Sequence, residues 1–147
     1  MAEVKQFATF YLDKLLFGVE VAKVQEVIRY QEMTRVPLAD SVVTGLINLR
    51  GQILTALDLR KRLELNEREP DKLPMNVVVR SGEEAVSLLV DEIGDVLEVE
   101  EDTFEPPPQT LQGVARELIR GAYKLPDRLL LVLDTEKTVT LNEGHAS

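Results

Sequence analysis

Cysteine and tryptophan are absent from this chain of 147 residues, and histidine occurs once, as His145. Without cysteine there can be no disulfide and no thiolate-bound zinc or iron–sulfur site. Nucleophilic catalysis needs an activated nucleophile beside a base, but no G-x-S-x-G motif occurs, and the histidine stands in the polar segment 142–147, which we expect to be a flexible tail. Glycine-rich phosphate loops are missing too. The sequence therefore predicts a protein with no enzymatic activity, no cofactor and no metal site.

Positive charge and aromatic side chains are scarce. The chain has 17 basic residues against 26 acidic ones, a formal net charge of −9, four phenylalanines and three tyrosines. Its densest basic stretch, residues 58–69, is interleaved with acids. Because affinity for DNA or RNA comes mainly from neutralising phosphates, we expect no nucleic-acid partner.

Long hydrophobic runs are also missing. No apolar stretch approaches the ~18–20 residues of a membrane-spanning helix, and the N-terminal residues lack the basic region and continuous apolar core of a signal peptide. We therefore expect a cytoplasmic protein with no direct membrane insertion. A chain of 147 residues is about one domain long and can bury a core without cross-links.

Short apolar runs separated by turn signals every ~8–12 residues dominate the chain, a pattern typical of β-sandwiches and β-barrels. They predict about ten strands and a few short helices, so the predicted fold class is all-β. Asp58 and Asp134 are each expected to cap a short helix. Apolar spacing in residues 21–28, and the segment 40–45 that ends at a glycine, predict two more short helical turns.

The polar, proline-bearing segment 66–74 is the best internal boundary. We expect a single domain over residues 1–147 with two subdomains, 13–72 and 73–141, and strand 6–12 could be shared with the second of them. No repeat is visible in the letters of the two parts. Both nevertheless run from apolar strands to a closing hairpin and a capped turn. This shared order is consistent with two small barrels joined side by side.

The stretch GLINLRGQILTALDL, residues 45–59, is the most informative local pattern. Asn48 and Gly51 favour the first and fourth places of a type I turn, with Arg50 third. In one interpretation this is only a well-made hairpin whose arginine is solvated. In the other, Leu49 and Arg50 are held rigidly for a partner. The pattern alone favours the first interpretation, because most turns only connect strands.

Glu26 raises the same question, since a helical turn there would place it near the rim of an apolar face. It is then either a solvated charge or an acid at the edge of an exposed apolar patch. The apolar neighbours of Glu26 and Arg50 belong more often to a core than to an interface, and the sequence leaves this open. These neighbours are Val24, Ile28, Ile47 and Leu49.

At this level of detail the chain resembles the CheW-type chemotaxis coupling proteins. The resemblance covers residues 4–141, and the N-L-R-G segment, with V-Q-E upstream and D-L-R downstream, is its most specific part. One departure is Thr55-Ala56, where the family often has Pro-Val, and we expect altered packing there without loss of function. The matching pieces are Phe17-Gly18, KVQEVI (23–28), Val36-Pro37, GLINLRG (45–51), LDLRKRL (57–63), LLVDEIGDVLEV (88–99) and IRGAYKLPDRLLLVLDTEKTV (119–139).

The resemblance implies a fold of two SH3-like five-stranded β-barrels packed side by side, with an apolar groove between them. It also implies a scaffold that bridges transmembrane chemoreceptors to the histidine kinase CheA. The helical hairpin tip of the receptor would lie in the groove, and the regulatory domain of the kinase, which has the same fold, would pack end to end against the barrels. The protein would then be cytoplasmic, at the membrane-associated receptor array.

The resemblance also implies that Glu26 and Arg50 face each other near the receptor groove. The residues implied to bind the receptor are Glu26, Arg50, Val24, Ile28, Ile47, Asn48, Leu49 and Gly51. Three alternatives stay open: a small-barrel nucleic-acid binder, a hydrolase using a pair of carboxylates, and the same coupler in a chemosensory pathway with another output such as pilus motility.

Overall fold

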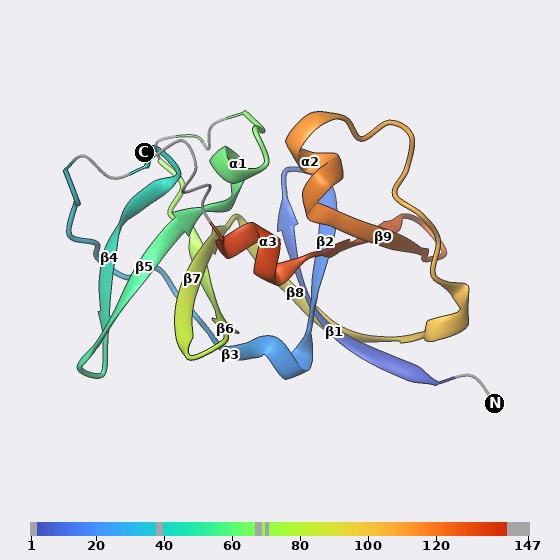
Figure 1. Ribbon diagram of the computed structural model, residues 1–147, viewed down its shortest axis with the longest axis horizontal. Helices are drawn as coiled ribbons and strands as arrows, with labels where there is room; N and C mark the ends of the chain where they lie inside the picture. Colours follow the sequence, from blue (N-terminus) through green and yellow to red (C-terminus); the bar gives the residue numbers. More distant parts are fainter. Residues whose placement is uncertain (1–2, 38–39, 67–68, 70, 141–147) are drawn as a thin grey trace.

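The computed structural model describes residues 3–37, 40–66, 69 and 71–140. In this part of the chain, ten strands form two five-stranded sheets, which stand side by side in Figure 1, and the all-β prediction is confirmed. The first sheet has the order β8-β1-β2-β10-β9, and the second the order β3-β6-β7-β5-β4. The strands are β1 (Val4–Leu12), β2 (Leu15–Glu20), β3 (Val24–Ile28), β4 (Val43–Leu49), β5 (Gln52–Asp58), β6 (Met75–Ser81), β7 (Glu84–Val90), β8 (Glu92–Glu100), β9 (Ile119–Lys124) and β10 (Leu129–Leu133).

The two sheets share one topology. Each is built around a hairpin, β1–β2 or β6–β7, whose second strand pairs in parallel with β10 or β5. In each sheet a backbone bridge also joins one edge strand to the segment that follows the other. Thr34, beyond β3, and Leu46 of β4 exchange two hydrogen bonds of 2.8 Å, and Glu105, beyond β8, and Ala122 of β9 exchange two of 2.8 and 2.9 Å. Both sheets are therefore closed into small barrels, called here barrel A (with β1) and barrel B (with β3).

The barrels do not coincide with the predicted subdomains 13–72 and 73–141. Strand β2, from the first part of the chain, lies in barrel A with β8, β9 and β10, whereas β6 and β7, from the second part, lie in barrel B. The N-terminal strand β1 pairs with β8 of the second part. Segment 66–74 is thus a boundary between two chain halves that exchange hairpins, and it does not separate the barrels.

The largest hydrophobic cluster lies between the barrels. It takes Phe10 and Phe17 from barrel A, whose rings stack at 5.9 Å, and Val77, Leu88 and further side chains from barrel B. Each barrel also encloses a smaller cluster of its own. Since burying a leucine or phenylalanine side chain stabilises the fold by about 1.5–3 kcal/mol, the two barrels depend on each other for much of their stability.

The helices are short and only partly as predicted. Helix α1 (Leu59–Arg62) and helix α3 (Thr135–Val139) follow the expected caps, because the Asp58 and Asp134 side chains each accept a hydrogen bond from a backbone N–H of the first turn. Helix α2 (Gly113–Leu118) is not among the predicted helices. Two 3₁₀ turns complete the set: η1 (Val21–Lys23) and η2 (Glu101–Thr103).

Two predicted helical turns are wrong. Residues 24–28 form strand β3, and only Val21–Lys23 is helical. Strand β4 begins at Val43, inside the segment expected to be a helix over 40–45. Strand pairing decides both cases, since β3 pairs with β6 and β4 with β5, and β-branched residues fit a pleated sheet well. The predicted tail 142–147, with His145, lies outside the described residues.

Candidate partner-binding site

The tip of the β4–β5 hairpin displays Arg50. Leu49 pairs with Gln52, so the loop contains only Arg50 and Gly51, whose φ angles of +52° and +86° are both positive. This is the pattern of a type I′ hairpin, whose twist matches that of the strands, and it replaces the predicted type I turn. The Asn48 side chain accepts a hydrogen bond of 2.9 Å from the Gly51 N–H and so holds the loop closed.

Strand β3 presents Glu26 to this tip. Glu26 lies opposite Val78, which belongs to the cluster inside barrel B, and residues directly opposite share a face of a sheet. A register shift between Val24 and Glu26 changes which residues of β3 turn inward. The carboxylate therefore stands on the inner side of β3, toward the edge that faces the hairpin.

Glu26 and Arg50 form a two-bonded ion pair. The Nη1 and Nη2 atoms of Arg50 donate to the two carboxylate oxygens of Glu26 at 2.7 and 2.8 Å. The hydrogen bond from Arg50 lowers the pKa of Glu26, and the same bond raises the pKa of Arg50. The arginine side chain is 70% exposed and the glutamate side chain 20%. A planar guanidinium is thus displayed at the surface in one fixed orientation.

The position of this ion pair explains why a charge stands at the hairpin tip. Strands β3 and β4 are the two edges of the sheet in barrel B, and no strand pairing joins them directly. The Thr34–Leu46 bridge joins the β3–β4 connection to β4, and the Glu26–Arg50 pair joins β3 to the tip of the β4–β5 hairpin. The arginine therefore has a structural role as well as an exposed surface.

Two residues implied to contact the receptor are buried instead. Ile47 is 1% exposed and Leu49 is 8% exposed, and both belong to the cluster inside barrel B. They support the hairpin from within and cannot offer an apolar surface to a partner. Val24 and Ile28 are half-buried against the inter-barrel cluster and the barrel B cluster respectively. Asn48, Arg50 and Gly51 remain exposed at the tip.

The exposed apolar residues near the barrel junction were missed by sequence reasoning. Val27 is 39% exposed and lies opposite Val77, so it shares the face of barrel B that packs on barrel A. Val96 is 58% exposed and lies opposite Ala8. Alternation along β1 places Ala8 and the 55% exposed Val4 on the same face as Phe10, which packs on barrel B.

Val4, Val27 and Val96, called here the apolar strip, are therefore exposed continuations of the two faces that form the inter-barrel core. Reading residues 24–28 as a strand would have identified Val27, because it alternates with Glu26 and Ile28. The strand pairing that adds Val96 is not visible in the sequence.

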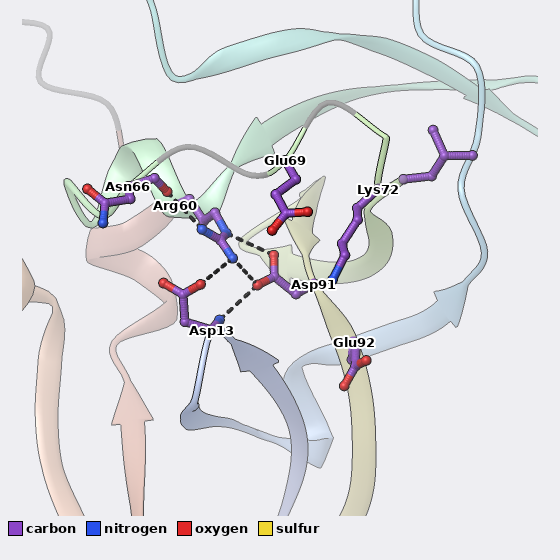
Figure 2. Close-up of a pocket in the computed structure, with 8 residues that line it drawn as sticks. Asp13, Arg60, Asn66, Glu69, Lys72, Asp91 and Glu92 are labelled. Carbon is purple, nitrogen blue, oxygen red and sulfur yellow. Dashed lines mark hydrogen bonds and ion pairs between the residues drawn. The ribbon is translucent and has the colours of Figure 1, made fainter.

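A cavity of about 560 Å³ beside segment 66–74 is lined by Arg60, whose side chain makes several hydrogen bonds (Figure 2). Arg60 of α1 donates to Asp91 from Nε at 2.9 Å and also from Nη2, to Asp13 at 2.6 Å, and to the Asn66 carbonyl at 2.9 Å. These bonds raise the pKa of Arg60, the bond to Asp91 being the largest cause.

Arg60 therefore connects α1 to the β1–β2 turn and to the β7–β8 junction. A hydrolase would need two close carboxylates in a concave pocket. Here the two close carboxylates, Asp13 and Asp91, hold chain segments together through one guanidinium. Among the described residues no group of three or more acidic or histidine side chains could hold a metal ion. No helix in the described part of the chain is long and apolar enough to cross a membrane.

Comparison with known proteins agrees with this geometry. Residues 6–143 match the family model described as a CheW-like domain. The chain belongs to the CheW family. The crystal structure of scaffolding protein TtCheW from Thermoanaerobacter tengcongensis superposes with a TM-score of 0.84 at 27% identity, covering 97% of this chain and 95% of that one.

Curated relatives span most of the chain. Chemotaxis protein CheW of Bacillus subtilis is 32% identical, covering 99% of this chain and 96% of its own length. Chemotaxis protein CheW of Klebsiella aerogenes is 30% identical, covering 95% of this chain and 84% of its own. The CheW resemblance is thus confirmed, and with it the role of a scaffold in chemotaxis.

Proposed function

We propose that this chain couples a chemoreceptor to the histidine kinase CheA in a cytoplasmic array at the membrane, and that it does so without catalysis. The observation that carries the proposal is the fixed Arg50 guanidinium beside Glu26, together with the apolar strip. A helical hairpin recognised by an apolar surface with oriented charges at its edge is a common mode of protein recognition.

The receptor surface in this proposal differs from the one implied by the sequence. Glu26, Arg50, Asn48 and Gly51 stay in it, as exposed or half-exposed groups. Ile47 and Leu49 become its internal support, and the exposed Val27 and Val96 take over the apolar contact. A valine exposed at 58% on a strand can be covered by a partner without any rearrangement of the core.

The kinase surface is assigned to the end of barrel B. Strand β4 is the outermost strand there (Figure 1). A groove of about 800 Å³ lies between the β3–β4 connection and Lys61 of α1. Its lining combines apolar side chains with cations, which suits packing against another small barrel. The residues that line it are Tyr30, Met33, Arg35, Val36, Pro37, Asp40, Ser41, Val43, Thr44 and Lys61.

Co-sedimentation tests the proposal. A membrane-templated receptor fragment should bring CheA from the same source into the pellet only when this chain is present. Val27→Asp should weaken binding to the receptor fragment at least tenfold while CheA binding is retained. Val36→Asp should weaken CheA binding at least tenfold while binding to the receptor fragment is retained.

The matched control for these substitutions is Leu15→Asp. Leu15 is 39% exposed and lies opposite Leu12, at the far end of β1 from Val4. This variant should bind both partners normally. Recovery of CheA in the pellet without the chain, or equal loss from all three variants, would refute the proposal.

A further inference from the structure

The two halves of the chain, residues 4–65 and 75–139, are built alike and interlock. Each half supplies a hairpin to one barrel and three strands to the other, and each ends in a short helix capped by an aspartate, α1 or α3. Half 1 gives β1–β2 to barrel A and β3, β4 and β5 to barrel B. Half 2 gives β6–β7 to barrel B and β8, β9 and β10 to barrel A. The molecule therefore consists of two structurally similar halves that are covalently linked in one chain.

Half of the strand pairing crosses between the halves. The pairings β1–β8, β2–β10, β3–β6 and β5–β7 join half 1 to half 2. Within half 1 only the hairpins β1–β2 and β4–β5 remain, and within half 2 only β6–β7 and β9–β10. Since isolated hairpins are marginally stable at best, each half needs the other to fold.

Segment 66–74 links the two halves covalently, and most of its described residues are exposed. The exposed residues are Asn66, Glu69, Asp71, Lys72 and Leu73, whereas Pro74 is buried. A segment of this length can reach up to about 30 Å when extended. The strand pairings between the halves do not require that both halves come from one chain, because the described residues of the link belong to no strand of either sheet.

We propose that two copies of this chain exchange halves, so that half 1 of each copy folds with half 2 of the other. Each half of one copy then pairs with the complementary half of the second copy, through the same strand pairings as in the monomer. A short link gives tethered halves an effective concentration of about 1 mM. The monomer therefore dominates at micromolar concentration, and the exchanged dimer forms when unfolded chains refold at concentrations near 1 mM.

Engineered cysteines test the exchange, since the chain has none of its own. Gln6 of half 1 and Glu98 of half 2 are exposed and directly opposite in the β1–β8 pairing, with a hydrogen bond of 3.1 Å between their side chains. A Gln6→Cys copy and a Glu98→Cys copy are unfolded, mixed at about 0.5 mM, refolded and mildly oxidised. Mass spectrometry then counts disulfides that join one copy to the other.

The matched control uses a pair inside one half. Lys124 and Leu129 are exposed and opposite each other in the β9–β10 pairing, and both belong to half 2. Copies carrying Lys124→Cys and Leu129→Cys cannot be joined by exchange, so they report random collision alone. For each pair, a single chain carrying both cysteines shows that the geometry allows the bond.

The Gln6/Glu98 mixture should give at least five times more joined copies than the Lys124/Leu129 mixture, in a species of dimer size that melts cooperatively. Yields equal to the control would overturn the proposal. A second measurement uses a protease site inserted between Asp71 and Lys72 of the full chain. After cleavage the halves should still elute as one particle, and their separation would also overturn the proposal.

Discussion

At the scale of single residues, the Glu26–Arg50 pair carries most of the proposed specificity. An exposed ion pair contributes little to stability, so a change at either residue should alter binding more than folding. Its short bonds of 2.7 and 2.8 Å nevertheless orient the guanidinium. The pair therefore contributes to binding mainly by holding the guanidinium in one orientation toward a partner, and less by the attraction between its own two charges.

A double-mutant cycle measures this coupling. Arg50→Glu and Glu26→Arg should each weaken binding to a receptor fragment at least tenfold, because like charges then face each other. The double reversal should recover part of the affinity, since the two side chains touch. Melting temperature is the control, and it should change little. Additive losses without recovery would show that the pair does not act as a unit in binding, and a large fall in melting temperature would show that its role is purely structural.

The pH dependence of stability provides a second test at this scale. The pKa of Glu26 is lowered in the folded protein, mainly by the hydrogen bond from Arg50. A lowered carboxyl pKa contributes stability above the unfolded-state value of about 4.3, and this contribution is lost as pH falls through the folded-state value. The melting-temperature difference between the parent and Glu26→Gln should therefore shrink below about pH 4. It should be small at every pH in an Arg50→Ala background, and a difference that does not change with pH would contradict this account.

At the scale of secondary-structure elements, α1 connects the barrels through two arginines. The Arg60 side chain is 9% exposed and holds Asp13 and Asp91. Arg62 donates to the carbonyls of Lys137, Thr138 and Thr140 at the end of α3. The helix has only four residues, yet it contacts the β1–β2 turn, the β7–β8 junction and α3.

The two arginines should differ in their effect on stability. Arg60→Met removes the buried guanidinium that binds both Asp13 and Asp91, so it should cost about 3 kcal/mol. Arg62→Met loses hydrogen bonds near the surface and should cost about 1 kcal/mol. Urea unfolding of both variants measures the difference. Equal and small losses would show that the Arg60 cluster adds little to the junction between the barrels.

At the scale of the whole molecule, interlocked halves make the fold indivisible. A fragment of residues 1–65 would keep two hairpins and an unpaired β3 and would expose the inter-barrel faces of Phe10 and Phe17. Exposed apolar surface of this extent leads to aggregation. The fragment should therefore be poorly soluble, as measured by sedimentation of the lysate. A monodisperse fragment with a cooperative melting transition would contradict the interlocked arrangement.

The sequence alone determined the local chemistry of this protein. The lack of cysteine, the hairpin signals around Gly51 and the helix caps Asp58 and Asp134 all act within a few residues, so they can be read from neighbouring letters. The family motif likewise identified Glu26 and Arg50 as partners, which the structure brings into contact.

Only the tertiary structure decided which strands pair and which faces are buried. The hydrogen bonds between β2 and β10, or β3 and β6, join residues far apart in the chain, and the letters of a strand do not name its partner. For this reason residues 24–28 form a strand despite a helical pattern, and the barrels cut across the predicted subdomains. Ile47 is buried because its side chain lies inside barrel B, whereas Val27 is exposed because it lies on the other face of its sheet, opposite Val77. Burial is therefore a property of the packed molecule and not of the residue type.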